Sequence, residues 1–202
     1  NYPNQNQEVL TKSKVELTNK ISEIIKPNTP CVGFIGAGNY ASRTLIPAFK
    51  EAGAVLDTLV TSGGISGVHH GNKNQFVTAS TNVEDLWGND SINTVSIVTR
   101  HDAHAQQVID ALNSGKNVFV EKPLALTLDE LDEIGKSYHK ANKSNTVRLM
   151  VGFNRRYAPH VIKMKKLLDS HRSPKSIIMT VNAGAIPGEH WVQDTLIGGG
   201  RI

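Results

Sequence analysis

The stretch VGFIGAGNYA, residues 32–41, decides the fold because it has the pattern of a buried strand, a tight glycine turn and the start of a helix. Gly36, Gly38 and Ala41 match the spacing G-x-G-x-x-G/A found in dinucleotide-binding proteins. Gly36 permits the tight turn, Gly38 lets the backbone approach a pyrophosphate, and Ala41 lets the helix pack closely on the strand. Free N–H groups at the start of the helix then bind the phosphates. A purely structural glycine turn is the alternative interpretation.

Short apolar runs alternate with amphipathic stretches on both sides of this turn. The apolar runs cover residues 31–35, 55–61, 94–98, 117–120 and 147–151. They are rich in Val and Ile and apolar on both faces, as a parallel sheet covered by helices requires. The stretches between them predict helices over 39–52, 82–88, 102–114 and 127–142, with no regular pattern elsewhere in 66–90. The sequence therefore predicts an α/β fold, a doubly wound parallel sheet of the Rossmann type over residues 30–152.

The two ends of the chain do not follow this alternation. Residues 1–29 begin rich in Asn and Gln and continue with a loose helical stripe over 8–25, so we interpret them as a linker or an appended helix. Toward the other end, a predicted helix over 158–170 and a β-like run over 176–182 precede a loop. Two elements do not make a domain, so we expect residues 153–202 to be the incomplete, truncated start of a second, α+β substrate domain. The apolar face of its β-like run predicts self-association, or else disorder after about residue 185.

Composition excludes several classes of protein. One Cys among 202 residues allows neither an internal disulfide nor a Cys-based metal cluster. The sequence has no apolar run of about 18 residues, the minimum for a membrane span, and its first residues do not have the pattern of a secretory signal. The net charge of +4 is scattered along the chain. We therefore expect a cytoplasmic protein that binds neither membranes nor nucleic acids.

The end of the second strand bears on the choice between NAD and NADP. An acidic residue about twenty positions after the glycines grips the ribose 2′-hydroxyl of NAD in many Rossmann proteins. Thr61 and Ser62 occupy that place here, and Asp57 comes too early in the strand. No basic clamp follows Ser62, although Arg43 on the first helix could reach the same region. NAD and NADP therefore both remain open.

A lysine follows another of the predicted strands. The run NVFVEKPLA, residues 117–125, places Glu121, Lys122 and Pro123 at the carboxyl end of a parallel strand, which is the edge where ligands bind. An ammonium there can donate a proton to a developing alkoxide, or the amine can accept one after a shift in its pKa. On these three residues alone, an exposed lysine before a turn-forming proline is the alternative.

The ordered set of motifs resembles the Gfo/Idh/MocA family of NAD(P)-dependent sugar and cyclitol oxidoreductases. The resemblance extends over residues 31–200 and is carried by GFIGAGNYASRTLIPAFK (33–50), SIVTRHDAHAQQVIDALNSGKNVFVEKPLA (96–125) and VGFNRRYAPH (151–160). It implies NAD or NADP as cofactor and hydride transfer at a secondary hydroxyl or keto group of a sugar, nucleotide sugar or cyclitol. It also implies a sharp turn at Glu-Lys-Pro, so we predict a cis bond between Lys122 and Pro123. A non-catalytic nucleotide-binding module, or a structural domain of a larger fused protein, is the alternative function.

The resemblance also implies roles for individual residues. Lys122 is the expected catalytic residue, beside the nicotinamide and the substrate hydroxyl. Together with the glycine turn and the end of the second strand, the expected cofactor-binding residues are Gly36, Gly38, Asn39, Tyr40, Thr61, Ser62, Thr99, Arg100, His104, Glu121, Lys122 and Pro123. The expected substrate-binding residues are Arg155, Arg156, Trp191 and Asp194, with an ion-paired hinge arginine as the alternative for the first two. We expect no metal, although His101 and His104 stand three positions apart.

Two further expectations concern what surrounds this chain. Family members carry an Asp and a His, four residues apart, beyond the glycines that correspond to 198–200, and this chain ends at Ile202 before that point. We therefore expect it to lack the complete catalytic set. The segment NYASR, residues 39–43, is similar to the branch of the family fused to a zinc alcohol-dehydrogenase-like domain. The expected partners are thus a carbohydrate-like small molecule and either a homo-oligomer or a fused or neighbouring domain.

Overall fold

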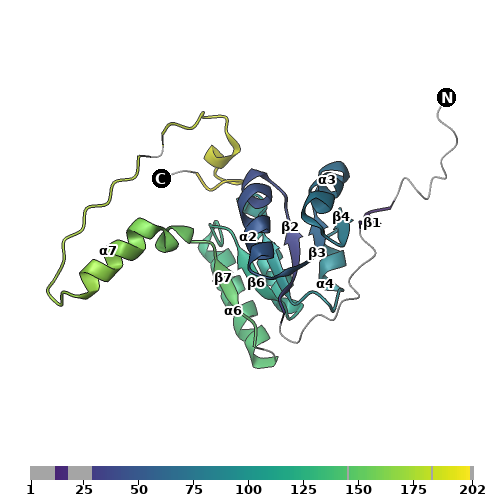
Figure 1. The fold of residues 1–202 in the computed structure, drawn as a ribbon, viewed down its shortest axis with the longest axis horizontal. Coiled ribbons are helices and arrows are strands. Elements are labelled where there is room, and N and C mark those ends of the chain that lie inside the picture. The colour runs from purple at the N-terminus through teal and green to yellow at the C-terminus, as the bar shows by residue number, and fades with distance from the viewer. Residues whose placement is uncertain (1–11, 18–28, 145, 183, 201–202) are drawn as a thin grey trace.

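The computed structural model describes residues 12–17, 29–144, 146–182 and 184–200 (Figure 1). Within these residues the strands form a seven-stranded sheet in the order β1-β4-β3-β2-β5-β6-β7. Their bounds are β1 Lys14–Glu16, β2 Cys31–Ile35, β3 Val55–Val60, β4 Thr78–Ser80, β5 Thr94–Ile97, β6 Asn117–Val120 and β7 Leu149–Val151. All neighbouring pairs are parallel except β1 with β4. The predicted doubly wound parallel sheet is confirmed.

Helices connect the parallel strands and cover the sheet. They are η1 Ala41–Leu45 with α2 Ile46–Glu51, α3 Gly64–Asn74, α4 Glu84–Trp87, η2 His101–Ala103 with α5 His104–Asn113, α6 Leu128–Ser144, η3 Asn154–Tyr157 with α7 Pro159–Asp169, and η4 Trp191–Gln193. Here α marks α-helices, η1 is a turn of π-helix, and the other η elements are 3₁₀ turns. The chain runs outward from β2 to β4 and then returns to β5 on the other side of β2. The carboxyl ends of β2 and β5 therefore form the switch point at which Rossmann sheets bind ligands.

Two apolar clusters of buried side chains stabilise the sheet. One packs between the sheet and α2, with Phe34 in edge-to-face contact with Phe49 and Phe76 at ring-centroid distances of 5.3 and 5.8 Å. The other includes buried residues of β5, α5, β6 and α6, among them Val95 and Val108. Strand β2 is buried along its whole length, which holds the glycine turn at its end in a fixed position.

Two elements differ from the sequence-based expectation. Helix α3 occupies residues 64–74, for which glycines and histidines gave no helical pattern. Its glycines are there for packing, because a Cβ at Gly67 would lie 2.7 Å from the Thr61 hydroxyl and a Cβ at Gly71 would meet Leu17. Residues 14–16 form β1 on the edge of β4, where the helical stripe over 8–25 was expected. The other residues of the 8–25 stripe are outside the described ranges, except 12, 13 and 17.

The C-terminal segment also differs from expectation. The run 176–182 was predicted to be a β-strand, but it forms no strand, and Ile178 and Met179 are 93% and 72% exposed. Among the described residues no neighbouring strand pairs with it, so its β-propensity is not realised. Helix α7 lies apart from the sheet in Figure 1. Self-association through this region stays a prediction.

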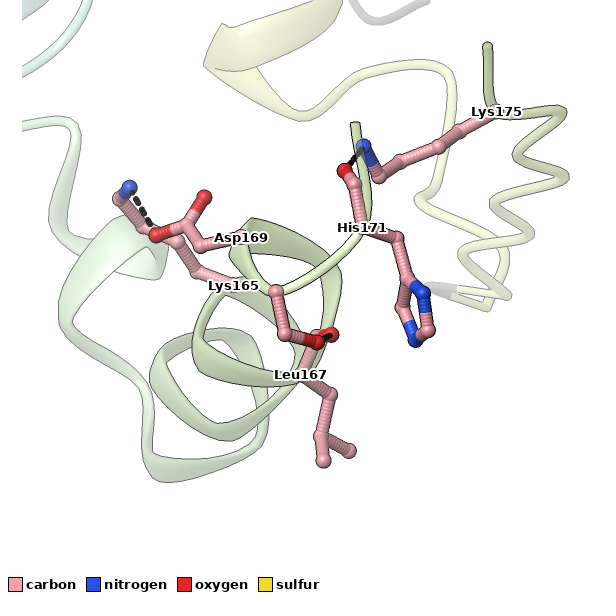
Figure 2. Close-up of polar contacts among 6 residues, drawn as sticks. Lys165, Leu167, Asp169, His171 and Lys175 are labelled. Carbon is pink, nitrogen blue, oxygen red and sulfur yellow. Dashed lines mark hydrogen bonds and ion pairs between the residues drawn. The ribbon is translucent and has the colours of Figure 1, made fainter. Parts of the chain in front are cut away.

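Local polar contacts order the end of α7 (Figure 2). Lys165 forms an exposed ion pair with Asp169, one helical turn later, at an N–O distance of 2.8 Å. The ammonium of Lys175 donates to the carbonyl of His171 at 2.6 Å. The exposed ion pair between Lys165 and Asp169 contributes little stability, about 0.3–0.5 kcal/mol.

No helix in the described part of the chain is both long and apolar enough to cross a membrane.

Candidate functional site

A cleft of about 1330 Å³ lies at the carboxyl ends of the parallel strands, at the switch point between β2 and β5. Residues that follow β2, β3, β5 and β6 line it, so segments far apart in the sequence meet there. Of the residues expected to bind a cofactor, those that line the cleft are Gly36, Gly38, Asn39, Tyr40, Thr61, Ser62, Thr99, Arg100, His104, Glu121 and Lys122. Pro123 does not line it.

The glycine turn fits the phosphate-binding role predicted for it. Gly36 has a φ of +101°, and a Cβ at this position would lie 2.6 Å from the Val98 carbonyl oxygen. Its N–H donates to the Val60 carbonyl at 2.8 Å, which fixes the turn against β3. Gly38 lines the cleft, and a Cβ there would meet no atom within 4 Å. The space in front of Gly38 is therefore open to a ligand that approaches the backbone, as a dinucleotide pyrophosphate does.

Lys122 lines the same cleft, immediately after β6. The N–H of Glu121 donates to the Ile97 carbonyl at 3.0 Å, which continues the pairing of β6 with β5 past the last strand residue. The peptide bond between Lys122 and Pro123 is cis, as predicted. The Lys122 side chain is exposed and lies among the lining residues. Its catalytic role stays a prediction.

His104 holds the Glu-Lys-Pro turn in place. Its ring is fully buried, with Nδ1 2.7 Å from the Pro123 carbonyl oxygen and Nε2 3.2 Å from that of Thr99. Burial lowers the pKa of His104, although both carbonyl contacts oppose this shift. We place a proton on Nδ1, which makes the shorter contact. His104 thus donates to Pro123 and fixes a residue that does not itself reach the cleft.

One oxygen atom of the Glu121 carboxyl group lacks a partner, and Glu121 lines the cleft. Its Oε1 atom is buried and has no hydrogen-bond partner among the described residues. Gly152 makes room for it, because a Cβ at that position would lie 2.6 Å from Oε1. Burial raises the pKa of Glu121, while the nearby backbone and charge of Lys122 oppose the shift. A buried polar atom without a partner, placed in a cleft, fits a ligand that brings its own hydrogen-bonding group.

Glu121→Gln should change how stability depends on pH. A carboxyl group whose pKa is raised by folding stabilises the fold below its unfolded pKa, about 4.3, and this contribution is lost as pH rises through the folded pKa. The parent chain should therefore lose stability relative to Glu121→Gln as the pH rises from about 4.3 through the folded pKa of Glu121. Urea unfolding at several pH values measures the difference. Parallel pH profiles for the two proteins, with the exposed Glu133→Gln as control, would show that the Glu121 pKa is not raised.

The expected substrate-binding residues are divided by the structure. Trp191 lines the cleft, whereas Arg155, Arg156 and Asp194 do not. Arg155 is exposed on η3, and the Arg156 guanidinium lies over the Tyr157 ring, 4.9 Å from its centroid. Asp194 caps a turn, because its Oδ1 accepts the N–H groups of Leu196 and Ile197 at 2.8 and 3.3 Å. The cleft therefore gives no support to substrate binding by these three residues.

The residues around Trp191 dock onto the sheet. The Trp191 ring makes an edge contact with His101 at 4.9 Å, and His101 Nδ1 lies 2.8 Å from the Gly198 carbonyl oxygen. The Asp102 N–H donates to the Ile197 carbonyl at 3.1 Å. Disorder after residue 185, one of the two expectations for this segment, is therefore wrong for described residues between 190 and 200.

His101 and His104 lie side by side, but the described residues contain no group of three or more His, Cys, Asp or Glu side chains arranged to hold a metal ion.

Several lining residues were not identified from the sequence. They are Ser66, Thr81, Val83, Gln107 and Asn154, besides apolar strand residues. Gln107 accepts from the Thr99 hydroxyl at 2.9 Å, and Asn154 donates to the Tyr40 hydroxyl at 2.9 Å. Gln107 stands one helical turn after His104, so helical spacing was the available signal. Asn154 lies within the VGFNRRY motif, but the sequence-based prediction named Arg155 and Arg156 from this motif instead.

The sequence and the fold both have known relatives. A sequence profile described as "Oxidoreductase family, NAD-binding Rossmann fold" (GFO_IDH_MocA) matches residues 31–153. Oxidoreductase P35 of Formosa agariphila is 34% identical over 140 residues, which cover 69% of this chain and 42% of that protein. Inositol 2-dehydrogenase/D-chiro-inositol 3-dehydrogenase of Lactiplantibacillus plantarum is 32% identical over 150 residues, covering 73% of this chain and 41% of that protein.

A solved structure shows the same fold. An oxidoreductase domain protein from Kribbella flavida matches with a TM-score of 0.63 and 27% sequence identity, covering 70% of this chain and 38% of that one. The chain thus spans less than half the length of the relatives it matches. The family match contains the parallel strands β2 to β7 and the cleft residues at their ends, apart from Asn154 and Trp191. The chain therefore belongs to the Gfo/Idh/MocA family of oxidoreductases, whose cofactor is NAD or NADP.

Proposed function

We propose that this chain forms the cofactor-binding part of a dehydrogenase that interconverts a secondary hydroxyl and a ketone on a sugar, nucleotide sugar or cyclitol. One observation carries the proposal: a single cleft joins the open backbone at Gly38 to the Lys122 side chain. The name of the Lactiplantibacillus relative, an inositol dehydrogenase, supports the cyclitol class. The proposal includes residues 30–152 as the dinucleotide-binding domain and 153–202 as the start of a substrate domain.

The residues of the cleft have distinct tasks in this reaction. A bound nicotinamide dinucleotide would supply the hydride donor or acceptor. The backbone at Gly36 and Gly38 binds its pyrophosphate. In the reducing direction the Lys122 ammonium donates a proton to the substrate oxygen that becomes the hydroxyl, and in the oxidising direction the neutral amine accepts that proton. His104 positions Lys122 by holding the carbonyl of Pro123, the next residue.

A titration of the purified chain with NADH tests the proposal directly. We expect saturable binding, measured by the fluorescence of the reduced nicotinamide, with a dissociation constant in the range of about 1 μM to 1 mM that is usual for enzyme ligands. A chain that binds neither NADH nor NADPH would refute the proposed function. Assays of the protein that contains this chain, with inositols and sugars as substrates, then separate an enzyme from a non-catalytic binding module.

We also propose that the protein is cytoplasmic and that this chain is fused to a zinc alcohol-dehydrogenase-like domain.

A further inference from the structure

The end of the cleft formed by β3 and β4 is uncharged. The residues that line it there are Val60, Thr61, Ser62, Ser66, Thr81 and Val83. Among the described residues, the acidic and basic side chains that line the cleft all follow β5 or β6, at the opposite end. A ligand group bound beside β3 therefore meets hydroxyls and aliphatic groups, and neither a carboxylate nor a cation.

This end of the cleft corresponds to the place where Rossmann proteins distinguish NAD from NADP. A carboxylate at the end of the second strand binds the ribose 2′-hydroxyl of NAD, whereas an arginine nearby accommodates the 2′-phosphate of NADP. Strand β3 is the second strand here, counted from β2, and it ends at Val60. Ser62, two residues later, is exposed and lines the cleft. Ser62 therefore occupies the selecting position.

The hydroxyl groups of Thr61 and Ser66, which are close to Ser62 in the sequence, already donate hydrogen bonds within the protein. Thr61 is buried, and its hydroxyl donates to the Gly63 carbonyl at 2.8 Å. The Ser66 hydroxyl donates to the same carbonyl at 2.8 Å. Ser62 forms no side-chain hydrogen bond with the described residues, so its hydroxyl is available to a ligand. A serine hydroxyl both donates and accepts, so it can pair with a 2′-hydroxyl or with a phosphate oxygen.

Asp57 and Arg43, the two charged residues that the sequence offers for this role, do not line the cleft. Asp57 is only 3% exposed, and its Oδ1 accepts from the Thr58 hydroxyl at 2.6 Å and the Asn89 amide at 3.0 Å. Its carboxylate is therefore committed within the protein interior. Arg43 on η1 is not among the residues that line the cleft. The described residues that line the cleft beside β3 therefore include neither an acidic nor a basic selector.

We propose that Ser62 gives this chain dual cofactor specificity, so that it binds NAD and NADP with comparable affinity. The inference rests on the proposed function, because it concerns the same cofactor cleft. Without a carboxylate, the 2′-phosphate of NADP meets no like charge, and without a cation it gains no ion pair. Affinity for both dinucleotides then comes from the contacts that they share.

Parallel titrations with NADH and NADPH test the inference through binding alone. The two dissociation constants of the parent chain should agree within about tenfold, equivalent to about 1.4 kcal/mol. Ser62→Asp should weaken NADPH at least about tenfold relative to NADH, because two negative charges then face each other. Ser62→Arg should change the ratio in the opposite direction. Ser173→Asp, the same charge change at an exposed residue outside the cleft, is the matched control.

The outcomes separate this inference from the function on which it rests. A preference of more than about tenfold by the parent chain would overturn dual specificity and leave the oxidoreductase proposal intact. An unchanged ratio in both Ser62→Asp and Ser62→Arg would overturn the assignment of Ser62 as the selecting residue. Failure of the parent chain to bind either dinucleotide would overturn both proposals.

Discussion

Gly38→Val is expected to abolish the binding of NADH and NADPH while leaving the fold intact. A Cβ at Gly38 meets no protein atom within 4 Å, so a side chain there begins in open space. It projects instead into the space where the pyrophosphate approaches the backbone. We expect affinity to fall at least about a hundredfold, beyond the range of a fluorescence titration. Urea unfolding should give nearly the same stability as the parent chain.

Gly135→Val is the matched control for this variant. Gly135 lies on α6, outside the cleft, and a Cβ there also meets no atom within 4 Å. This variant should bind NADH as the parent does. Gly36 is unsuitable for the same experiment, because its φ of +101° and its approach to the Val98 carbonyl make any side chain destabilising. Normal NADH binding by a folded Gly38→Val protein would show that the pyrophosphate does not lie over Gly38.

The fold was largely predictable because its core strands are buried on both faces. Strands β2 and β6 have the predicted bounds, since a continuous apolar run leaves little choice of start or end. Helix α3 was not predicted, because its glycines lower helix propensity while allowing close packing against Thr61 and Leu17. Strand β1 was not predicted either, because its three residues are exposed and, among the described strands, pair only with the edge of β4.

The site was predictable where residues follow strands and much less so elsewhere. The ends of parallel strands meet at one edge, so the residues after β2, β3, β5 and β6 could be grouped from the sequence alone. Trp191 and Asp194 were both predicted to bind the substrate, yet Trp191 lines the cleft and Asp194 caps a turn. Their separation depends on how the segment from 190 to 200 docks on η2, which no local pattern encodes.

Lys122→Ala should reduce turnover by about 10²–10⁴-fold in the enzyme that contains this chain, the usual effect of losing a general acid–base group. The dissociation constant for NADH should hardly change, because the open backbone at Gly38 follows β2, two strands away from β6, which Lys122 follows. Lys175→Ala is the matched control. Lys175 is exposed in the C-terminal segment, and its ammonium donates to the backbone carbonyl of His171 (Figure 2). Its other hydrogen bond with the described residues is to the backbone carbonyl of Ser173.

Lys122→Arg separates proton transfer from a simple requirement for positive charge. A guanidinium keeps the charge but has a pKa above about 12, so it neither releases nor accepts a proton near neutral pH. If Lys122 exchanges a proton with the substrate oxygen, this variant should lose nearly as much turnover as Lys122→Ala. Turnover close to that of the parent in Lys122→Arg would instead assign Lys122 an electrostatic role, and normal turnover in Lys122→Ala would remove it from the mechanism.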